Sequence, residues 1–139
     1  MAIRIVRLGS PRHRGEGVRL GTVRRPPRGV PKSEFASRDY YDVWLPNLAP
    51  SESVLRAGRA AFARRAAAPR AAESDAAWRR FDRAFTAEMK QRDAARLLDA
   101  LAALSHSADF AIGCYCEDES RCHRSILRRE LQRRGAALA

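Results

Sequence analysis

The sequence predicts a single α/β domain in which a small, mostly parallel sheet is flanked by helices. Three observations support this fold: short strand-like segments near the start of the chain, amphipathic helical segments in its middle, and a strand, a loop and a helix in succession near its end. A chain of 139 residues with 45% hydrophobic content can bury one modest core. Without an internal repeat or a second apolar unit, residues 1–139 are expected to form one domain.

Two short strands are expected early in the chain. Apolar and charged residues roughly alternate from Ala2 to Leu8, and residues 18–23 form a second short apolar segment. The stretch RRPPRGVPK, residues 24–32, contains three prolines and a glycine, which exclude regular structure. It predicts a rigid loop that carries arginines. An aromatic stretch, DYYDVWLPNLAP, follows at residues 39–50.

Three helices are expected in the middle of the chain. Ser51 is a suitable N-cap for the first, which should end before Pro69, and the second should begin near Ser74. The third covers about residues 92–104. The inward-facing residues expected on the second and third helices are Trp78, Phe81, Phe85 and Met89, then Leu97, Leu98, Leu101 and Leu104.

The clearest strand in the sequence is DFAIGCYC, residues 109–116, which is short, apolar and expected at the centre of the sheet. The last helix should cover about residues 123–134, with Ile126, Leu127 and Leu131 facing inward. Gly135 is the kind of residue that ends a helix at the C′ position.

The net charge of +11 is large and uneven. Residues 1–38 carry ten basic and two acidic side chains (+8), residues 39–120 eleven and thirteen (−2), and residues 121–139 six and one (+5). If the two basic ends meet, they form a positive surface that suits phosphate or nucleic acid. The alternative is a solvated arginine-rich surface that reflects a GC-rich genome.

No apolar run is long enough for a membrane span, and the first residues lack the apolar region of a signal peptide. The sequence therefore predicts a cytoplasmic protein without a membrane partner. In that compartment its three cysteines are expected to be reduced.

The stretch CYCEDESRCHRSIL, residues 114–127, contains all three cysteines. If a strand precedes it and a helix begins at His123, the cluster lies where open α/β sheets bind ligands. The unpaired N–H groups of the helix start favour an anion there. Arg124 adds a planar fork for phosphate or carboxylate, and Ser125 adds a hydroxyl. These residues indicate an anion site.

Two other chemistries fit the same residues. A cysteine at a helix start beside histidine has a lowered pKa, so Cys122 is a candidate catalytic nucleophile with His123 as its partner. Alternatively, Cys114, Cys116, Cys122 and His123 are ligand types that suit zinc or iron. Their spacing is not that of a standard zinc finger, so the first expectation is no metal and no cofactor. Glu117, Asp118 and Glu119 must point away from an anion or act as acid, base or cation ligands.

Several segments together resemble the DUF488 family of uncharacterised bacterial and archaeal proteins, in particular its YeaO-like branch. The stretch RLGTVRRPPRG, residues 19–29, is similar to an R-x-L-V-D-R-x-W-P-R-G pattern. Trp44 followed by Ala49-Pro50-Ser51 is similar to a tryptophan followed by APS. Phe81, Phe85, Glu88 and Met89 match a middle helix pattern. The most specific match is a strand that ends in cysteine, followed by Cys122-His123-Arg124.

The chain also departs from this pattern. Val23 stands where the family has aspartate, Pro26 stands where it has tryptophan, and Cys116 occupies a position that is often acidic. The resemblance implies a compact α/β domain in which a set of site residues converges, but it implies no established reaction. That set comprises Arg24, Arg28, Ser51, Cys122, His123 and Arg124.

The sequence thus predicts an anion pocket at the start of the last helix, completed by arginines of the 24–28 loop. The expected ligand is phosphate-bearing: a nucleotide, a phosphometabolite or nucleic acid. A small enzyme that uses Cys122 and His123, or a Cys/His metal-binding protein, is the alternative.

Overall fold

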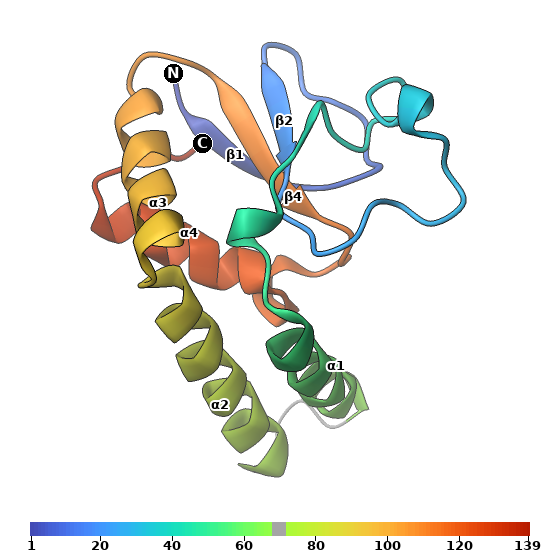
Figure 1. Cartoon of the computed structure of the whole chain (residues 1–139), viewed down its shortest axis with the longest axis vertical. Coiled ribbons are helices and arrows are strands. Elements are labelled where there is room, and N and C mark those ends of the chain that lie inside the picture. The colour runs from blue at the N-terminus through green and yellow to red at the C-terminus, as the bar shows by residue number, and fades with distance from the viewer. Residues whose placement is uncertain (68–71) are drawn as a thin grey trace.

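A computed structural model describes the backbone of residues 1–67 and 72–139, and the side chains of residues 1–59, 76–120 and 122–139. A four-stranded, fully parallel sheet lies beside four α-helices (Figure 1). The strands are β1 (Ile3–Arg7), β2 (Val18–Gly21), β3 (Val43–Trp44) and β4 (Phe110–Cys114), in the spatial order β1-β4-β2-β3. The predicted α/β class and the parallel sheet are confirmed.

Strand β4 is central and pairs with a neighbour on each edge. Phe110 aligns with Ile3 of β1 on one side and with Val18 of β2 on the other. All five residues of β4 are buried, which is why this segment is an unbroken apolar run. The strand thus brings residues from the end of the chain between two segments from its beginning.

The helices are α1 (Glu52–Ala67), α2 (Ala72–Met89), α3 (Arg92–Leu104) and α4 (His123–Arg133). Ser51 precedes α1, and its Oγ accepts the Val54 N–H at 3.5 Å. The turn expected around Pro69 falls at residues 68–71, outside the described residues, and α2 already includes Ser74. Gly135 follows α4 with a φ of 76°, as a C′ glycine does. Across the described residues, no helix has the length and apolar character that crossing a bilayer requires.

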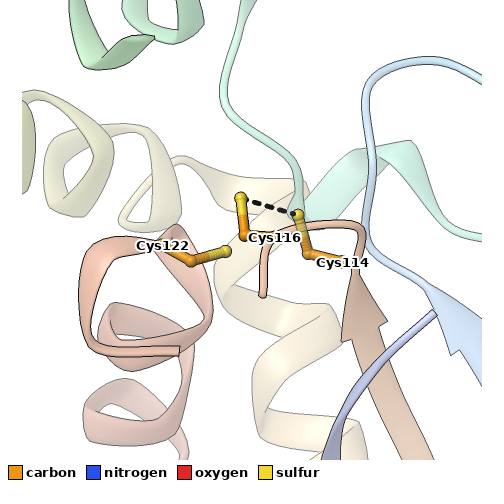
Figure 2. Close-up of side chains that lie close together, drawn as sticks. All are labelled: Cys114, Cys116 and Cys122. Carbon is orange, nitrogen blue, oxygen red and sulfur yellow. Dashed lines mark hydrogen bonds between the residues drawn. The ribbon is translucent and has the colours of Figure 1, made fainter. Parts of the chain in front are cut away.

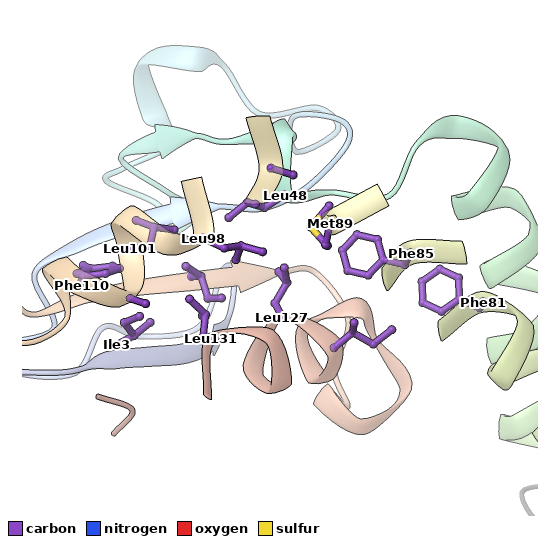
Figure 3. Packing of buried hydrophobic residues seen from close by; sticks show 14 residues of the cluster. Ile3, Leu48, Phe81, Phe85, Met89, Leu98, Leu101, Phe110, Leu127 and Leu131 are labelled. Carbon is purple, nitrogen blue, oxygen red and sulfur yellow. The ribbon is translucent and has the colours of Figure 1, made fainter. Parts of the chain in front are cut away.

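The main core lies between the sheet and helices α2, α3 and α4 (Figure 3). Phe110 and Ile112 of β4 contribute to it, because alternate strand residues face the same side. The labelled residues of Figure 3 are Ile3, Leu48, Phe81, Phe85, Met89, Leu98, Leu101, Phe110, Leu127 and Leu131.

One core expectation is wrong and two are only partly met. Leu104 is 51% exposed, and Trp78 and Leu97 are only partly buried against the core. At this end of α3 the buried position belongs to Ser105, whose hydroxyl donates to Ala102 O at 2.6 Å and accepts the Ala137 N–H at 2.8 Å. A polar anchor for the C-terminal segment thus takes the place expected for the last leucine.

The opposite face of the sheet is covered by a smaller hydrophobic cluster. It combines Val6 and Leu8 with Tyr41 of the aromatic stretch and with Cys114 and Cys122. The aromatic stretch also forms β3, which the sequence did not predict because it is only two residues long. Trp44 fixes this edge by donating its indole N–H to Val23 O at 2.8 Å.

A buried ion pair holds the long β1–β2 connection in place. The Arg19 guanidinium donates to both carboxylate oxygens of Glu16, at 2.7 and 2.9 Å. It also donates to Ser10 O and Asp39 O, at 2.9 and 2.7 Å. Arg19 is 0% and Glu16 is 3% exposed, so these bonds join three loop segments inside the protein.

Replacing Glu16 with glutamine should strand the buried Arg19 charge. We expect the free energy of unfolding, measured by urea denaturation at neutral pH, to fall by about 3–5 kcal/mol. Arg96→Gln is the control, because its pair with Asp99 is 83% and 48% exposed. That change should cost less than about 1 kcal/mol. An equal effect of the two substitutions would contradict this role for the ion pair.

The same pair should make the fold sensitive to acid. Burial by itself raises the pKa of Glu16, but the hydrogen bonds and charge of Arg19 lower it below its ordinary value of 4.5. When the pH falls below that value, the unfolded state therefore takes up the proton first. The stabilisation is complete above pH 4.5 and is lost as the pH falls through the folded-state pKa. The stability of Glu16→Gln, measured by thermal denaturation, should depend less on pH in this acid range; an unchanged acid dependence would contradict the assignment.

Candidate functional site

The site residues gather at the carboxyl ends of β2 and β4, where α4 begins. Cys122 immediately precedes α4 and has an extended backbone, with φ −138° and ψ 155°. The next residue, His123, reaches across to Thr22, just after β2, with its Nε2 2.7 Å from Thr22 O. The first and last segments of the chain therefore meet at this edge of the sheet, as ligand sites of parallel α/β domains require.

His123 is held in one orientation beside Cys122. Because Thr22 O can only accept, His123 Nε2 must carry the proton of that bond. Nδ1 then faces Cys122 Sγ at 3.7 Å. Phe85 packs edge-on against the imidazole at a centroid distance of 5.4 Å, and His123 is only 4% exposed. The ring is thus fixed by a backbone carbonyl and an aromatic neighbour, in the way a thiol's base partner must be oriented.

All three cysteines converge beside this histidine. Their sulfur atoms lie within 4.8 Å of one another, and the Cys114 thiol donates to Cys116 Sγ at 3.8 Å. Figure 2 shows that two sulfurs come from the end of β4 and the turn after it, while the third comes from the start of α4. Cys114 and Cys116 are two residues apart, so they reach the same side, and none of the three is in a disulfide.

The thiols in this cluster differ in acidity. Hydrogen bonds from Cys114 and Cys116, and then the charge of His123, lower the pKa of Cys122 well below its usual range despite burial. For Cys114 the hydrogen bond with Cys116 lowers the pKa, but the bond to Cys122 and burial outweigh it and raise the value to about 12. Burial lowers the pKa of His123, but the Cys122 thiolate more than offsets this and raises it. Both shifts favour the charged forms, a thiolate at Cys122 and a protonated His123.

Arg124 and Ser125 are turned toward the protein rather than toward a ligand. Arg124 is 3% exposed and donates from Nη2 to Cys116 O at 2.6 Å, while its buried Nε has no hydrogen-bond partner among the described residues. Ser125 Oγ donates to Cys122 O at 2.9 Å. The two side chains shape the turn that presents the cysteines, and neither lines the adjoining cavity among the described residues.

A cavity of about 230 Å³ opens beside the cysteines. Arg24 is fixed in its wall by donating from Nε to Pro50 O at 2.8 Å and from Nη2 to Pro46 O and Ala49 O at 3.3 and 3.2 Å. These carbonyls orient the guanidinium without neutralising it. The described lining residues are Val23, Arg24, Arg25, Pro50, Leu55, Arg59, Cys114, Tyr115, Cys116 and His123.

Three lining residues were not singled out by the sequence: Arg25, Arg59 and Tyr115. Arg25 forms an exposed ion pair with Glu52 at 2.7 Å, and its carbonyl accepts the Tyr115 hydroxyl at 2.8 Å. Arg59 reaches the cavity from α1, one turn after Leu55. That i, i+4 spacing was a signal for a shared helix face, but nothing in the sequence showed where the face pointed.

Two expected ligand residues do not reach this cavity. Arg28 is exposed on the proline-rich loop and is not among the described lining residues. Ser51 lies on a neighbouring open cleft of about 620 Å³, where its N–H donates to Glu88 Oε1 at 2.9 Å. That cleft also contains Asp93 beside Arg92, so its charges offset one another. The smaller cavity is the better candidate for an anion.

The acidic loop turns away from the cavity. Glu119 accepts two hydrogen bonds from Arg128, at 2.6 and 2.9 Å. Asp118 Oδ1 accepts the Ser120 N–H at 2.9 Å, and Glu117 is exposed. None of the three is among the described residues that line the cavity. These carboxylates therefore form no part of the described cavity wall.

The fold and the site define a parallel α/β domain with a cysteine–histidine pair at the carboxyl edge of its sheet. The chain matches the family model DUF488-N3a, described as the active DUF488-N3 subclade, over residues 3–135. It therefore belongs to the DUF488 family, as the resemblance of its sequence indicated. No match was found among curated proteins or among solved structures.

The thiolate at Cys122 can be tested without a ligand. In reduced, chelator-treated protein at neutral pH, we expect the ultraviolet absorbance of about one thiolate per chain, because one thiol has a lowered pKa. Cys122→Ala should remove this absorbance, and acid should remove it from the wild-type protein. Ser125→Ala is the control that leaves all thiols in place. Equal thiolate absorbance in wild type and Cys122→Ala would contradict the assignment.

Proposed function

We propose that the protein binds a phosphate-bearing small molecule, a nucleotide or a phosphometabolite, in the cavity beside the cysteines. The observation that carries this proposal is the composition of the wall: Arg24, Arg25 and Arg59 line it, and no carboxylate is among its described lining residues. Arginine guanidinium groups suit phosphate because they donate two parallel hydrogen bonds to its oxygens.

The three arginines differ in how free they are to bind. Arg24 is immobilised by backbone carbonyls and has its charge in place before a ligand arrives. The Arg25–Glu52 pair is 65% and 58% exposed, and an exposed pair contributes only about 0–1 kcal/mol, so a phosphate can replace Glu52. Arg59 has no ion-pair partner in the described part of the chain. Arg24 is therefore already oriented before a phosphate binds, whereas Arg25 and Arg59 can move to contact it.

The size of the cavity favours a small ligand or the phosphate end of a larger one. At about 230 Å³ it is below the roughly 300–1,000 Å³ that encloses a drug-sized molecule. Three arginines of α4 and Arg134 just after it, which could have formed part of a nucleic-acid surface, are instead paired with carboxylates. These pairs are Arg128–Glu119, Arg129–Asp82, Arg133–Glu130 and Arg134–Asp99. We therefore favour a small phosphate ligand over nucleic acid.

A second candidate function is thiol chemistry on the bound molecule, favoured by the oriented Cys122–His123 pair. Cys122 would supply the nucleophilic thiolate and His123 would return the proton to a leaving group. The family model is described as an active subclade, which agrees with a reaction at this site. Cys122 is 0% exposed, however, so its sulfur must become accessible before it attacks.

Arg59→Gln should weaken binding of a phosphate probe. With pyrophosphate and a panel of nucleotides as probes in calorimetric titrations, we expect the affinity to fall about 10- to 100-fold, as for loss of one charge-assisted hydrogen bond worth about 1.5–3 kcal/mol. Arg56→Gln is the matched control: it lies on the same helix and is exposed but is not among the described lining residues. It should bind like the wild type.

The same titrations separate a small ligand from nucleic acid. Binding to a nucleic acid weakens by about one log unit per log of salt for each phosphate contacted, so a steep dependence together with tighter binding of an oligonucleotide would favour nucleic acid. If Arg59→Gln and Arg56→Gln had equal affinities for every probe, the cavity would be ruled out as the phosphate-binding site.

A further inference from the structure

Packing alone does not explain why the sulfur atoms of the three cysteines lie together. Cys114 and Cys122 are 7% and 0% exposed, and Cys116 is half-buried beside them. Thiols form only weak hydrogen bonds, so placing three together gains little stability over three separate apolar contacts. Their convergence from the end of a strand and the start of a helix (Figure 2) therefore points to a shared task.

We propose that Cys114, Cys116 and Cys122 bind a thiophilic divalent metal ion of the zinc type, with its fourth coordination position open to the arginine-lined cavity. The sulfur atoms lie within 4.8 Å of one another, and one pair is 3.8 Å apart. Tetrahedral zinc with bonds of about 2.3 Å separates its sulfur ligands by about 3.8 Å. One pair already has this spacing, and the third sulfur needs at most a small side-chain adjustment.

The fourth ligand does not come from the nearby side chains. The described ligand atoms that lie within 4.8 Å of one another are the three sulfurs. His123 is not in that group, and its Nε2 is bonded to Thr22 O. Glu119 is bound to Arg128. What adjoins the sulfurs is the cavity, whose described lining includes Cys114 and Cys116. Three protein ligands with an open position is the arrangement of catalytic rather than structural zinc sites.

The surroundings suit the charge of such a centre. A divalent ion with three thiolates has a net charge of −1, which is costly to bury alone. Here His123 Nδ1 lies 3.7 Å from Cys122 Sγ. Arg124, buried with no carboxylate partner in the described structure, holds Cys116 O at 2.6 Å. A buried guanidinium needs a nearby negative charge, and the metal–thiolate centre provides it.

This site rests on sulfur geometry alone and does not depend on the phosphate ligand. If metal and phosphate are both present, the ion forms the floor of the cavity and the three arginines form its wall. A phosphate oxygen can then occupy the open coordination position. The two proposals can fail separately, because one is tested on the cysteines and the other on Arg59.

Cobalt provides the test, because Co²⁺ bound by thiolates in a tetrahedral site gives visible d–d bands and a sulfur-to-metal charge-transfer band. We expect reduced, metal-free protein to bind one equivalent of Co²⁺ with these bands, and Zn²⁺ to displace it. Cys116→Ser changes the most accessible of the three cysteines, so it is the variant least expected to disturb the core. It should bind Co²⁺ at least about 100-fold more weakly, since even loss of an outer-shell partner costs about 10–100-fold.

Tyr115→Phe is the matched control, because it alters the residue beside Cys116 but removes no sulfur; it should give the wild-type spectrum. Arg59→Gln should also bind Co²⁺ normally, even if its phosphate affinity is lost. Circular dichroism of each variant confirms that it is folded. Absence of thiolate–cobalt bands in the wild-type protein with Co²⁺ in excess would overturn the proposal. So would unchanged bands in both Cys116→Ser and Cys122→Ser.

Discussion

The pairing of β4 on both edges is the constraint on which the rest of the structure depends. Five consecutive buried residues, from Phe110 to Cys114, bond in parallel to β1 on one side and to β2 on the other. A parallel strand with both edges used must be covered on both faces. Helices α2, α3 and α4 cover one face, and the aromatic segment around Tyr41 covers the other. Both the core and the site follow from where this strand ends.

Because β4 ends beside β2, the turn after it and the start of α4 lie against the segment after β2. The bond between His123 and Thr22 O, 2.7 Å long, closes this contact. It also decides which imidazole nitrogen faces Cys122 and so links the fold to the chemistry of the thiols. A strand-end cysteine, a turn cysteine and a helix-start cysteine meet there. The proposed metal and phosphate sites share this edge and face the same cavity.

The structure shows that part of the protein's positive charge is held in ion pairs. A net charge of +11 suggests a broad basic surface. Arg128 and Arg129 of α4 and Arg134 after it, however, are paired with carboxylates from other segments, and Arg19 is buried against Glu16. Such pairs hold segments together rather than attract a polyanion. Arg24, Arg25 and Arg59 lie together on the cavity wall with no carboxylate among its described lining residues, which is why a local phosphate site is favoured.

The sequence by itself determined the fold class, the central strand, the four helices and the Cys122-His123-Arg124 turn, because apolar periodicity and helix-start residues act over a few neighbouring positions. It also marked the cysteines and the Arg24 loop as one region. The tertiary structure alone decided that Arg124 and Ser125 turn inward, that Arg28 stays outside the cavity, and that Arg59 of α1 enters it. It also decided that Leu104 is exposed and that three sulfurs meet. These features depend on how segments that are far apart in the chain are placed in space. Local sequence patterns do not contain that information, because they reflect only neighbouring residues.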